Sequence, residues 1–235
     1  MELRYNRHFT RTLRLLLGLM ISFVLVGCYT KSFSIKDIGK SSVDMVIDLH
    51  RKENQVLLGE LIEKLYKRNP AELRKYPSET IESRKHELLS SSSRPIHFTS
   101  LQNARDIHAM DLAFDPTFTG DRVFALMAGL TDMLNASYNY HKEFFLWDNI
   151  DENRIYRSAR NIDILAWKLK TQKLPNGQPF LVTDNTNGVT DNTSFERLYG
   201  KLIANQDMVA KIVGDRTNRN MSSAIQTTTL VFLPL

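Results

Sequence analysis

Hydrophobic positions follow a helical period along most of the chain after residue 40. Ser41, with Asp44 three residues later, is typical of a helix start, because the hydroxyl can cap the first backbone N–H groups and the acid suits the helix dipole. Asn69-Pro70 indicates the end of this helix and the start of another. Between these signals, apolar residues recur about every 3.6 positions, at Val43, Val46, Ile47, Leu57, Leu58, Leu61, Ile62 and Leu65.

The same analysis predicts a series of further helices. Their boundaries come from capping residues, from proline and glycine, and from apolar stripes. We expect helices from Pro70 to about Tyr76, after Ser78 as a cap up to Leu89, from Thr99 to about Phe114, from Thr119–Asp121 onward, from Asp148–Asp151 to about Lys173, from a Thr193 cap to a stop at Gly214, and over Asn218–Gln226.

One predicted helix contains the eight-residue run Val123–Leu130, which is apolar on every side. A helix without a polar face is buried on all sides, so we expect this one at the centre of the fold. Its small residues Ala125, Ala128 and Gly129 would allow neighbouring helices to approach closely.

Only two segments favour a strand. Phe180–Thr183 is short and apolar, and Thr227–Leu235 is β-branched and apolar, so the two could pair. Between the predicted helices, Asp184–Asn192 is the strongest candidate for an exposed loop. The fold class predicted is therefore mainly α: a single domain of about seven or eight helices, with at most one small two-stranded β element.

Composition supports one folded domain. The chain has 235 residues, 42% of them hydrophobic, with 10 Gly, 7 Pro and one Cys. These values exclude collagen-like, low-complexity and disulfide-framework proteins. The mean hydropathy is −0.30 and no apolar run reaches the ~18 residues of a membrane-spanning helix, which excludes a polytopic membrane protein.

The first 28 residues have a different organisation. Met1–Arg14 carries four arginines against one glutamate, and Leu15–Val26 is an apolar stretch whose length suits a secretory signal peptide. Leu25, Val26, Gly27 and Cys28 follow in order. This segment resembles the signal peptide and lipobox of bacterial lipoproteins, in which a small residue precedes the cysteine that becomes lipidated.

The resemblance implies a covalent lipid anchor. Diacylglycerol would be attached to the Cys28 sulfur, and a signal peptidase that recognises Leu25, Val26 and Gly27 would cleave before the cysteine. Residues 1–27 are then a cleaved signal peptide, residues 28–40 a lipidated tether, and residues 41–235 a helical periplasmic domain. Two or three acyl chains hold a protein stably on a bilayer, whereas one does not. The alternative is an uncleaved signal anchor with an incidental cysteine.

Cleavage changes the interpretation of charge. It removes Arg4, Arg7, Arg11, Arg14 and Glu2, which lowers the formal charge from +5 to about +2. The basic character is therefore mostly that of the signal peptide, and we expect no nucleic-acid partner. Residue 29 is Tyr rather than the Asp associated with inner-membrane retention in Gram-negative lipoproteins, so the resemblance implies an outer-membrane location facing the periplasm.

Motifs for catalysis are absent from the sequence. There is no GxSxG, P-loop, GxGxxG, HExxH or CxxC, and we assign no catalytic residue, metal site or cofactor. Three pairs share a helix face at metal-ligand spacing: His50 with Glu53, Glu82 with His86, and His108 with Asp111. We interpret them as helix-surface or hydrogen-bonded pairs rather than as ligands.

His50 and Asn54 interrupt the apolar stripe of the first helix. Either this turn faces solvent, or the two polar groups are buried with partners, because an unpaired buried group costs ~1–3 kcal/mol. A third interpretation is a polar spot that recognises a partner.

Tyr138–Trp147 is unusually rich in aromatic residues. It forms either the end of a helix whose rings fill the core or a surface that binds lipid headgroups, sugar or protein. We favour the core interpretation, and the residues of the candidate partner surface are Tyr138, Tyr140, Phe144, Phe145 and Trp147.

These observations favour a membrane-anchored envelope lipoprotein whose helical domain binds or scaffolds another envelope component, and they favour a non-enzymatic protein over an enzyme. Its contact surface would be the aromatic segment or the Asp184–Asn192 loop. The alternative is a periplasmic hydrolase or ligand carrier, which would require several of His50, His86, His108 and His141 to converge with carboxylates in an apolar pocket.

Overall fold

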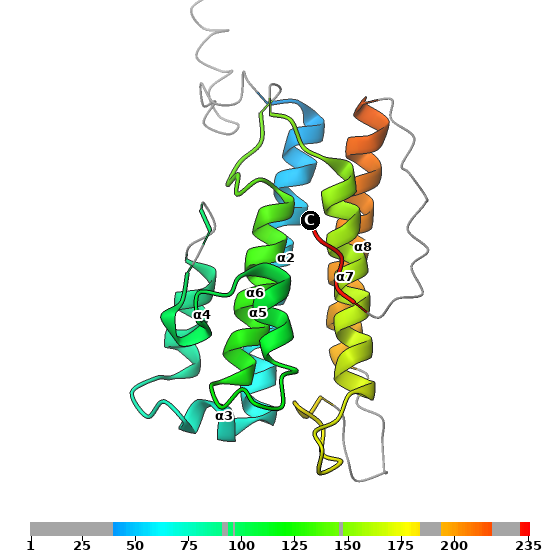
Figure 1. The fold of residues 1–235 in the computed structure, drawn as a ribbon. Coiled ribbons are helices and arrows are strands. Elements are labelled where there is room, and N and C mark those ends of the chain that lie inside the picture. Colours follow the sequence, from blue (N-terminus) through cyan, green and yellow to red (C-terminus); the bar gives the residue numbers. More distant parts are fainter. Residues whose placement is uncertain (1–39, 91–93, 96, 146–147, 184–193, 218–230) are drawn as a thin grey trace, which may run out of the picture. The chain divides into compact units, whose positions relative to one another are not determined.

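The computed structural model describes residues 40–90, 94–95, 97–145, 148–183, 194–217 and 231–235. The chain divides into the units Met1–Lys40 and Ser41–Leu235, and the described helices belong to the second. The described residues are mainly α-helical and contain no strand, which confirms the predicted fold class (Figure 1). Its elements are α2 (Ser42–Arg68), α3 (Pro70–Arg74), α4 (Ile81–Leu89), a 3-10 turn (Thr99–Leu101), α5 (Asp106–Leu112), α6 (Arg122–Ser137), α7 (Glu152–Thr171) and α8 (Ser194–Thr217).

The predicted start and end of α2 are both confirmed. Ser41 is the N-cap and forms a capping box with Asp44: the Asp44 N–H donates to the Ser41 hydroxyl, and the Ser41 N–H donates to the Asp44 carboxylate. Asn69 ends the helix, and Pro70 opens α3. The Ser41 and Asp44 side chains accept hydrogen bonds from backbone N–H groups at the helix start, and Pro70 has no N–H group that would need a partner there.

Three predicted boundaries are wrong by a few residues. α3 ends at Arg74 rather than Tyr76, and α4 is capped by Thr80, which forms a capping box with Ser83, rather than by Ser78. α8 continues through Gly214 to Thr217. Gly214 does not adopt the positive φ that would end the helix; among the described glycines, only Gly177 has a positive φ. Glycine permits a helix end without imposing one.

The predicted helix over Thr99–Phe114 is interrupted. A 3-10 turn over Thr99–Leu101 is followed by Gln102 and Asn103 at φ 54° and 60°, and α5 begins only at Asp106. Consecutive residues in the left-handed region cannot belong to a right-handed helix, so the capping pattern leads only into a single turn.

α6 is the central helix, as predicted. All sixteen of its residues are buried, and α5 packs closely along it. A Cβ atom on Gly129 would lie 2.5 Å from both the Asp106 carbonyl oxygen and the Met110 nitrogen of α5. The absence of a side chain at Gly129 therefore brings the two helix backbones together.

α2, α4, α5 and α7 pack against α6, and α8 packs against α7 and α2, with α7 and α8 forming the most extensive helix pair (Figure 1). One large apolar cluster extends from Leu57 on α2 through α6 to Leu202 on α8, and a smaller cluster joins Ile47, Phe144, Ile155 and Val209. The small cluster lies where the N-terminal half of α2 meets the C-terminal half of α8.

The predicted strand pairing is wrong for the described residues. Phe180–Thr183 and Val231–Leu235 contain no strand, and residues 227–230 lie outside the described part. Each segment instead pairs with an asparagine side chain. The Val182 N–H donates to the Asn69 Oδ1 (2.7 Å) and the Asn69 amide donates to the Val182 carbonyl (3.1 Å). Asn161 holds Leu233 in the same way. Each asparagine side chain makes the same pair of hydrogen bonds that a neighbouring strand would make.

Candidate functional site

The main exposed apolar feature of the described helices is a stripe on the N-terminal half of α2. Met45, Leu49 and Val56 are 54%, 65% and 55% exposed, and Val46 beside them is 38% exposed. Spacings of four and seven residues place the first three on one face of the helix. We call Met45, Val46, Leu49 and Val56 the α2 stripe. Surface patches of this kind are typical of contact sites for other molecules.

This stripe was not identified from the sequence. Val46 belongs to the recurring apolar residues of the predicted helix, and it lies at the edge of the exposed face. The signal was present, because Met45, Leu49 and Val56 follow a second apolar spacing on the side opposite Ile47 and Leu58. A helix with two apolar faces has only one that the rest of the fold can cover.

Two residues of the aromatic segment belong to the core, which agrees with the favoured interpretation and removes these two from the candidate partner surface. Tyr138 is 2% exposed and Phe144 is fully buried, and their rings pack against each other at 5.8 Å between centroids. The Phe144 N–H donates to the buried Asp48 carboxylate on α2. This region closes the small apolar cluster after α6 ends.

Tyr140 and Phe145, the other described aromatic residues of the segment, do not form an exposed patch. Tyr140 is partly buried, and its hydroxyl donates to Asp132 (2.9 Å) while accepting from Arg105 (3.0 Å). Arg105 also forms an ion pair with Asp132 at 3.2 Å. Phe145 is partly buried, whereas Trp147 and the Asp184–Asn192 loop lie outside the described residues.

The histidines do not converge on one site. His86 and His108 are exposed on α4 and α5, and His141 lies 3.7 Å from Asp148 in the segment after α6. Asp111, which shares a helix face with His108, forms an ion pair with Lys168 at 2.7 Å instead. In the part of the chain that the structure describes, no three His, Cys, Asp or Glu residues are grouped as a metal site.

His50 and Asn54 belong to a buried hydrogen-bond network. The Asn54 amide donates to the Gln206 Oε1 (3.0 Å) and accepts from Asn205 (3.1 Å), and the His50 Nδ1 lies 3.2 Å from the Asn205 Oδ1. This result confirms the prediction of burial with partners for Asn54, whereas His50 is only partly buried. The polar residues that interrupt the buried apolar face of α2 are therefore the ones that hydrogen-bond α2 to α8.

Gln206 is the centre of this network and is fully buried. Its Oε1 accepts from Asn54 and from the Tyr138 hydroxyl, and its amide nitrogen donates to the hydroxyls of Ser137 and Ser158. All four hydrogen-bonding positions of the side chain are used. The network therefore joins α2, α6, α7 and α8 through one residue.

A second buried polar group lies at the start of α6. Asp121 caps the helix by accepting from the Phe124 N–H (2.9 Å), and it also accepts from the Tyr66 hydroxyl (2.8 Å). Burial raises the pKa of Asp121 above its usual value. The pKa of Tyr66 is also raised, mainly by burial and to a lesser extent by the neighbouring Asp121 carboxylate. Because both groups are occupied with each other and with the helix end, their arrangement is structural.

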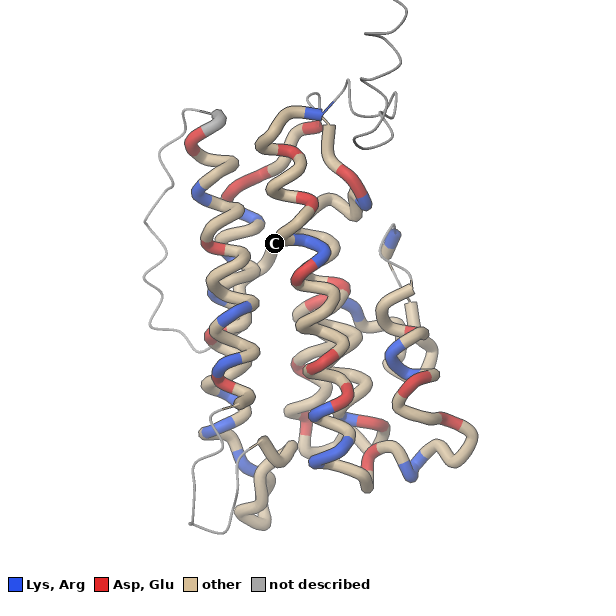
Figure 2. The backbone as a smooth tube through the Cα atoms, turned by 180° about the vertical axis from the view of Figure 1, so that it is seen from behind, with Lys and Arg blue, Asp and Glu red and all other residues tan. Residues whose placement is uncertain are grey.

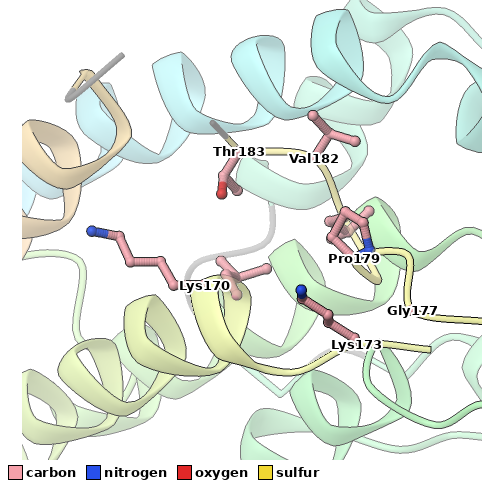
Figure 3. A pocket seen from close by; sticks show the side chains of 8 residues that line it. Lys170, Lys173, Gly177, Pro179, Val182 and Thr183 are labelled. Atoms are coloured by element: carbon pink, nitrogen blue, oxygen red, sulfur yellow. The ribbon is translucent and has the colours of Figure 1, made fainter. Parts of the chain in front are cut away.

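A small pocket lies between the end of α7 and the segment after it (Figure 3). Its volume is about 290 Å³, and Lys170 and Lys173 lie at its edge. Lys170 forms an ion pair with Glu196 at 2.8 Å. None of the eight lining residues has a carboxylate or an imidazole side chain. They are Leu169, Lys170, Lys173, Gly177, Pro179, Leu181, Val182 and Thr183.

Charged residues are distributed over the helices. Lys and Arg positions alternate with Asp and Glu positions along the backbone (Figure 2). Several form exposed or partly exposed ion pairs within or between helices, such as Arg160 with Asp207 and Lys67 with Glu63. Such pairs contribute little each, typically below ~1 kcal/mol.

Comparison of the chain with protein-family models, with curated proteins and with solved structures finds no match in any of the three. Among the described residues, none of the helices combines the length and the hydrophobicity needed to span a bilayer. The lipobox residues Leu25, Val26, Gly27 and Cys28 precede the described part of the chain.

Proposed function

We propose that this protein is a bacterial envelope lipoprotein, anchored to the outer membrane through Cys28, whose helical domain binds another envelope protein. The observation that carries the proposal is the order of three features: a basic segment, a twelve-residue apolar segment, and the lipobox Leu25–Cys28. Each is common alone, whereas their succession at these lengths is specific to lipidated secretory proteins.

The position of the helical body supports a tethered arrangement. α2 is capped at Ser41, twelve residues after Tyr29 opens the segment that follows the lipobox cysteine. At ~3.3–3.6 Å per extended residue, this segment could span up to about 40 Å. In the sequence, only this short segment separates the proposed anchor from the first helix of the domain.

The α2 stripe is the surface that we propose for the protein partner. Its residues lie four and seven positions apart on one helix face, and an amphipathic helix of a partner can pack against such a row. Lys52 and Glu53 are exposed and lie between Leu49 and Val56 along the helix, so the surface combines apolar and charged residues. This distribution is typical of a protein contact.

The anchor is tested by mass and fractionation. In wild type, we expect the mature chain to begin at Cys28 and to carry acyl mass, and to fractionate with the outer membrane. Cys28→Ser should remove the acyl mass and release the folded domain from the membrane fraction. A wild-type chain that still begins at Met1 without acyl mass would refute the anchor.

The contact surface is tested separately by photocrosslinking in cells. A crosslinking amino acid at Leu49 should capture a specific protein, and one at Lys201, an exposed position of α8, serves as the matched control. Leu49→Lys in a chain crosslinked from Val56 should reduce capture at least tenfold. Equal capture from Leu49 and Lys201, or capture that ignores Leu49→Lys, would refute the stripe as a docking surface.

A further inference from the structure

The segment Val231–Leu235 follows α7 as an extended chain (red in Figure 1). Its contacts to that helix are made through the main chain as well as through side chains. The Asn161 amide donates to the Leu233 carbonyl (2.8 Å), and the Leu233 N–H donates to the Asn161 Oδ1 (2.6 Å). A neighbouring strand would make the same pair of bonds, so Asn161 recognises extended backbone rather than a particular side chain.

Two further groups recognise the residues on either side of Leu233. Phe232 is 3% exposed, and the Lys168 ammonium lies 4.0 Å from the centre of its ring. On the other side, the Arg157 guanidinium donates to the Pro234 carbonyl at 3.3 Å. Together these contacts recognise an aromatic side chain at position 232, the backbone N–H and carbonyl of residue 233, and the backbone carbonyl of residue 234.

The recognising side chains are held in place by partners other than the segment. Lys168 donates to Asp111 on α5 at 2.7 Å. The Asn161 amide also lies 3.4 Å from the Met133 sulfur on α6. Two of the three groups are therefore positioned by the helices, which is the condition for a preformed peptide site.

The segment itself is only partly integrated into the core. Phe232 is buried, whereas Val231 is 65% exposed and Pro234 is exposed. Few buried contacts and solvent-facing backbone bonds are typical of the least stable parts of a fold. The segment is fixed by the Phe232 ring, the backbone pair with Asn161, the Arg157 bond to Pro234 and the packing of Leu235 against the large apolar cluster.

We propose that α7 carries a binding site for an extended peptide with one aromatic side chain, and that the same segment of a second copy of this chain can replace Phe232–Pro234 in it. The second copy is the partner we assign because its segment fits the site by the contacts already described. The exchange would join two chains without any new interface, as in domain swapping. The inference does not depend on the lipid anchor.

The site is tested first with a peptide. Leu233→Pro removes the N–H that donates to Asn161 but leaves the site intact, so this full-length variant should bind a labelled Val-Phe-Leu-Pro-Leu peptide saturably in fluorescence anisotropy. Adding Asn161→Ala, or replacing the third peptide residue by proline, should weaken binding at least about tenfold. Absence of binding, or binding that is indifferent to Asn161→Ala, would overturn the proposal.

The assignment to a second copy is tested by mixing two full-length variants. Leu233→Pro keeps the site and lacks a competent segment, whereas Asn161→Ala keeps the segment and lacks the site. We expect a heterodimer by analytical ultracentrifugation when the two are mixed, and monomers when each is alone. Lack of a heterodimer would overturn the second-copy assignment.

Folding of the variants is followed by circular dichroism. If Leu233→Pro does not fold, Phe232→Ala takes its place in both experiments, because it empties the aromatic position without changing the main chain. Unfolding of both variants would overturn the proposal, since the segment would then be a required part of the core.

Discussion

An asparagine side chain carries a donor and an acceptor in the same plane, and two asparagines of this chain use both on extended backbone. Asn69 pairs with Val182 and Asn161 with Leu233. In each case a segment that could otherwise expose unpaired main-chain groups obtains partners from a helix. The pairing explains why apolar segments with strand character remain outside any sheet.

We expect Asn69→Ala to lower the free energy of unfolding by about 2 kcal/mol, because the Val182 N–H and carbonyl would both lose their partner. Urea denaturation measures the change. Asn153→Ala, on the first turn of α7, is the control and should change stability by less than about 0.5 kcal/mol. Equal effects of the two variants would contradict the role of Asn69.

Asp121 should make stability depend on pH in a defined direction. Its pKa is raised by burial, so the folded state binds the proton more tightly than the unfolded state. Its contribution is therefore largest below the usual pKa of 3.8 and is lost as the pH rises through the raised value.

We expect wild type to gain stability relative to Asp121→Asn at about pH 3, and to lose that advantage by about pH 7. Urea midpoints of both proteins over this range provide the measurement. A difference between the two proteins that stays constant, or that grows toward neutral pH in favour of wild type, would contradict the direction of the shift.

At the scale of the helices, glycine has opposite consequences at two positions. Gly129 lies against the α5 backbone, whereas nothing lies within 4 Å of a Cβ on Gly200 of α8. The small-residue pattern within Val123–Leu130 predicted close packing correctly. It could not indicate which helix approaches, because sequence spacing does not specify the partner.

We expect Gly129→Ala to destabilise the protein by about 2–3 kcal/mol, since the added methyl group would overlap α5 backbone atoms that cannot move independently. Gly200→Ala should stabilise it by up to about 1 kcal/mol through higher helix propensity. Thermal unfolding of both variants tests the pair. Destabilisation by both would indicate a general effect of the substitution instead of the specific contact.

Gln206 joins four elements, so its loss should affect more than one helix. Gln206→Ala would remove the acceptor of the Asn54 amide and of the Tyr138 hydroxyl, and one of the two partners of the Ser137 and Ser158 hydroxyls. We expect a loss of about 3 kcal/mol or more. Hydrogen exchange should accelerate in α2 and α8 together, while Lys201→Ala, exposed on the same helix, should leave both unchanged. Protection lost only around residue 206 would contradict the network.

At the scale of the whole molecule, helices and the central position of α6 could be predicted because they depend on local spacing. The cap at Thr80 was missed because Ser78 and Thr80 can both cap a helix. The start of α5 at Asp106 was missed because the left-handed residues Gln102 and Asn103 end the preceding turn. The Asn54–Gln206 bond and the two asparagine pairs join residues more than 70 positions apart. Local patterns contain no information about such contacts.

The candidate surface was predicted less well than the fold for a related reason. An aromatic side chain serves equally in a core and at an interface, so the composition of Tyr138–Trp147 could not separate the two. Burial of Tyr138 and Phe144 excludes them from a surface, and the exposed residues of α2 take their place. Which face of an amphipathic helix stays open depends on the number of neighbours that the fold provides.

The two faces of α2 should respond differently to a charge. Leu49 is 65% exposed, whereas Leu57 is 1% exposed in the large apolar cluster. We expect Leu49→Lys to change the free energy of unfolding by less than about 0.5 kcal/mol, and Leu57→Lys to prevent folding, because a buried unpaired charge is very costly. Circular dichroism with urea titration distinguishes them. A large loss of stability in Leu49→Lys would show that this face is covered.

The bidentate amide at Asn69 also bears on which variants of the chain remain viable. It engages atoms that nineteen of the twenty amino acids share, since only proline lacks the N–H group. A saturation library at residue 182, sorted for correctly folded product, should consequently retain residues of quite different size and polarity and be depleted mainly of proline. Sequence drift at this position would then be compatible with an unchanged backbone path.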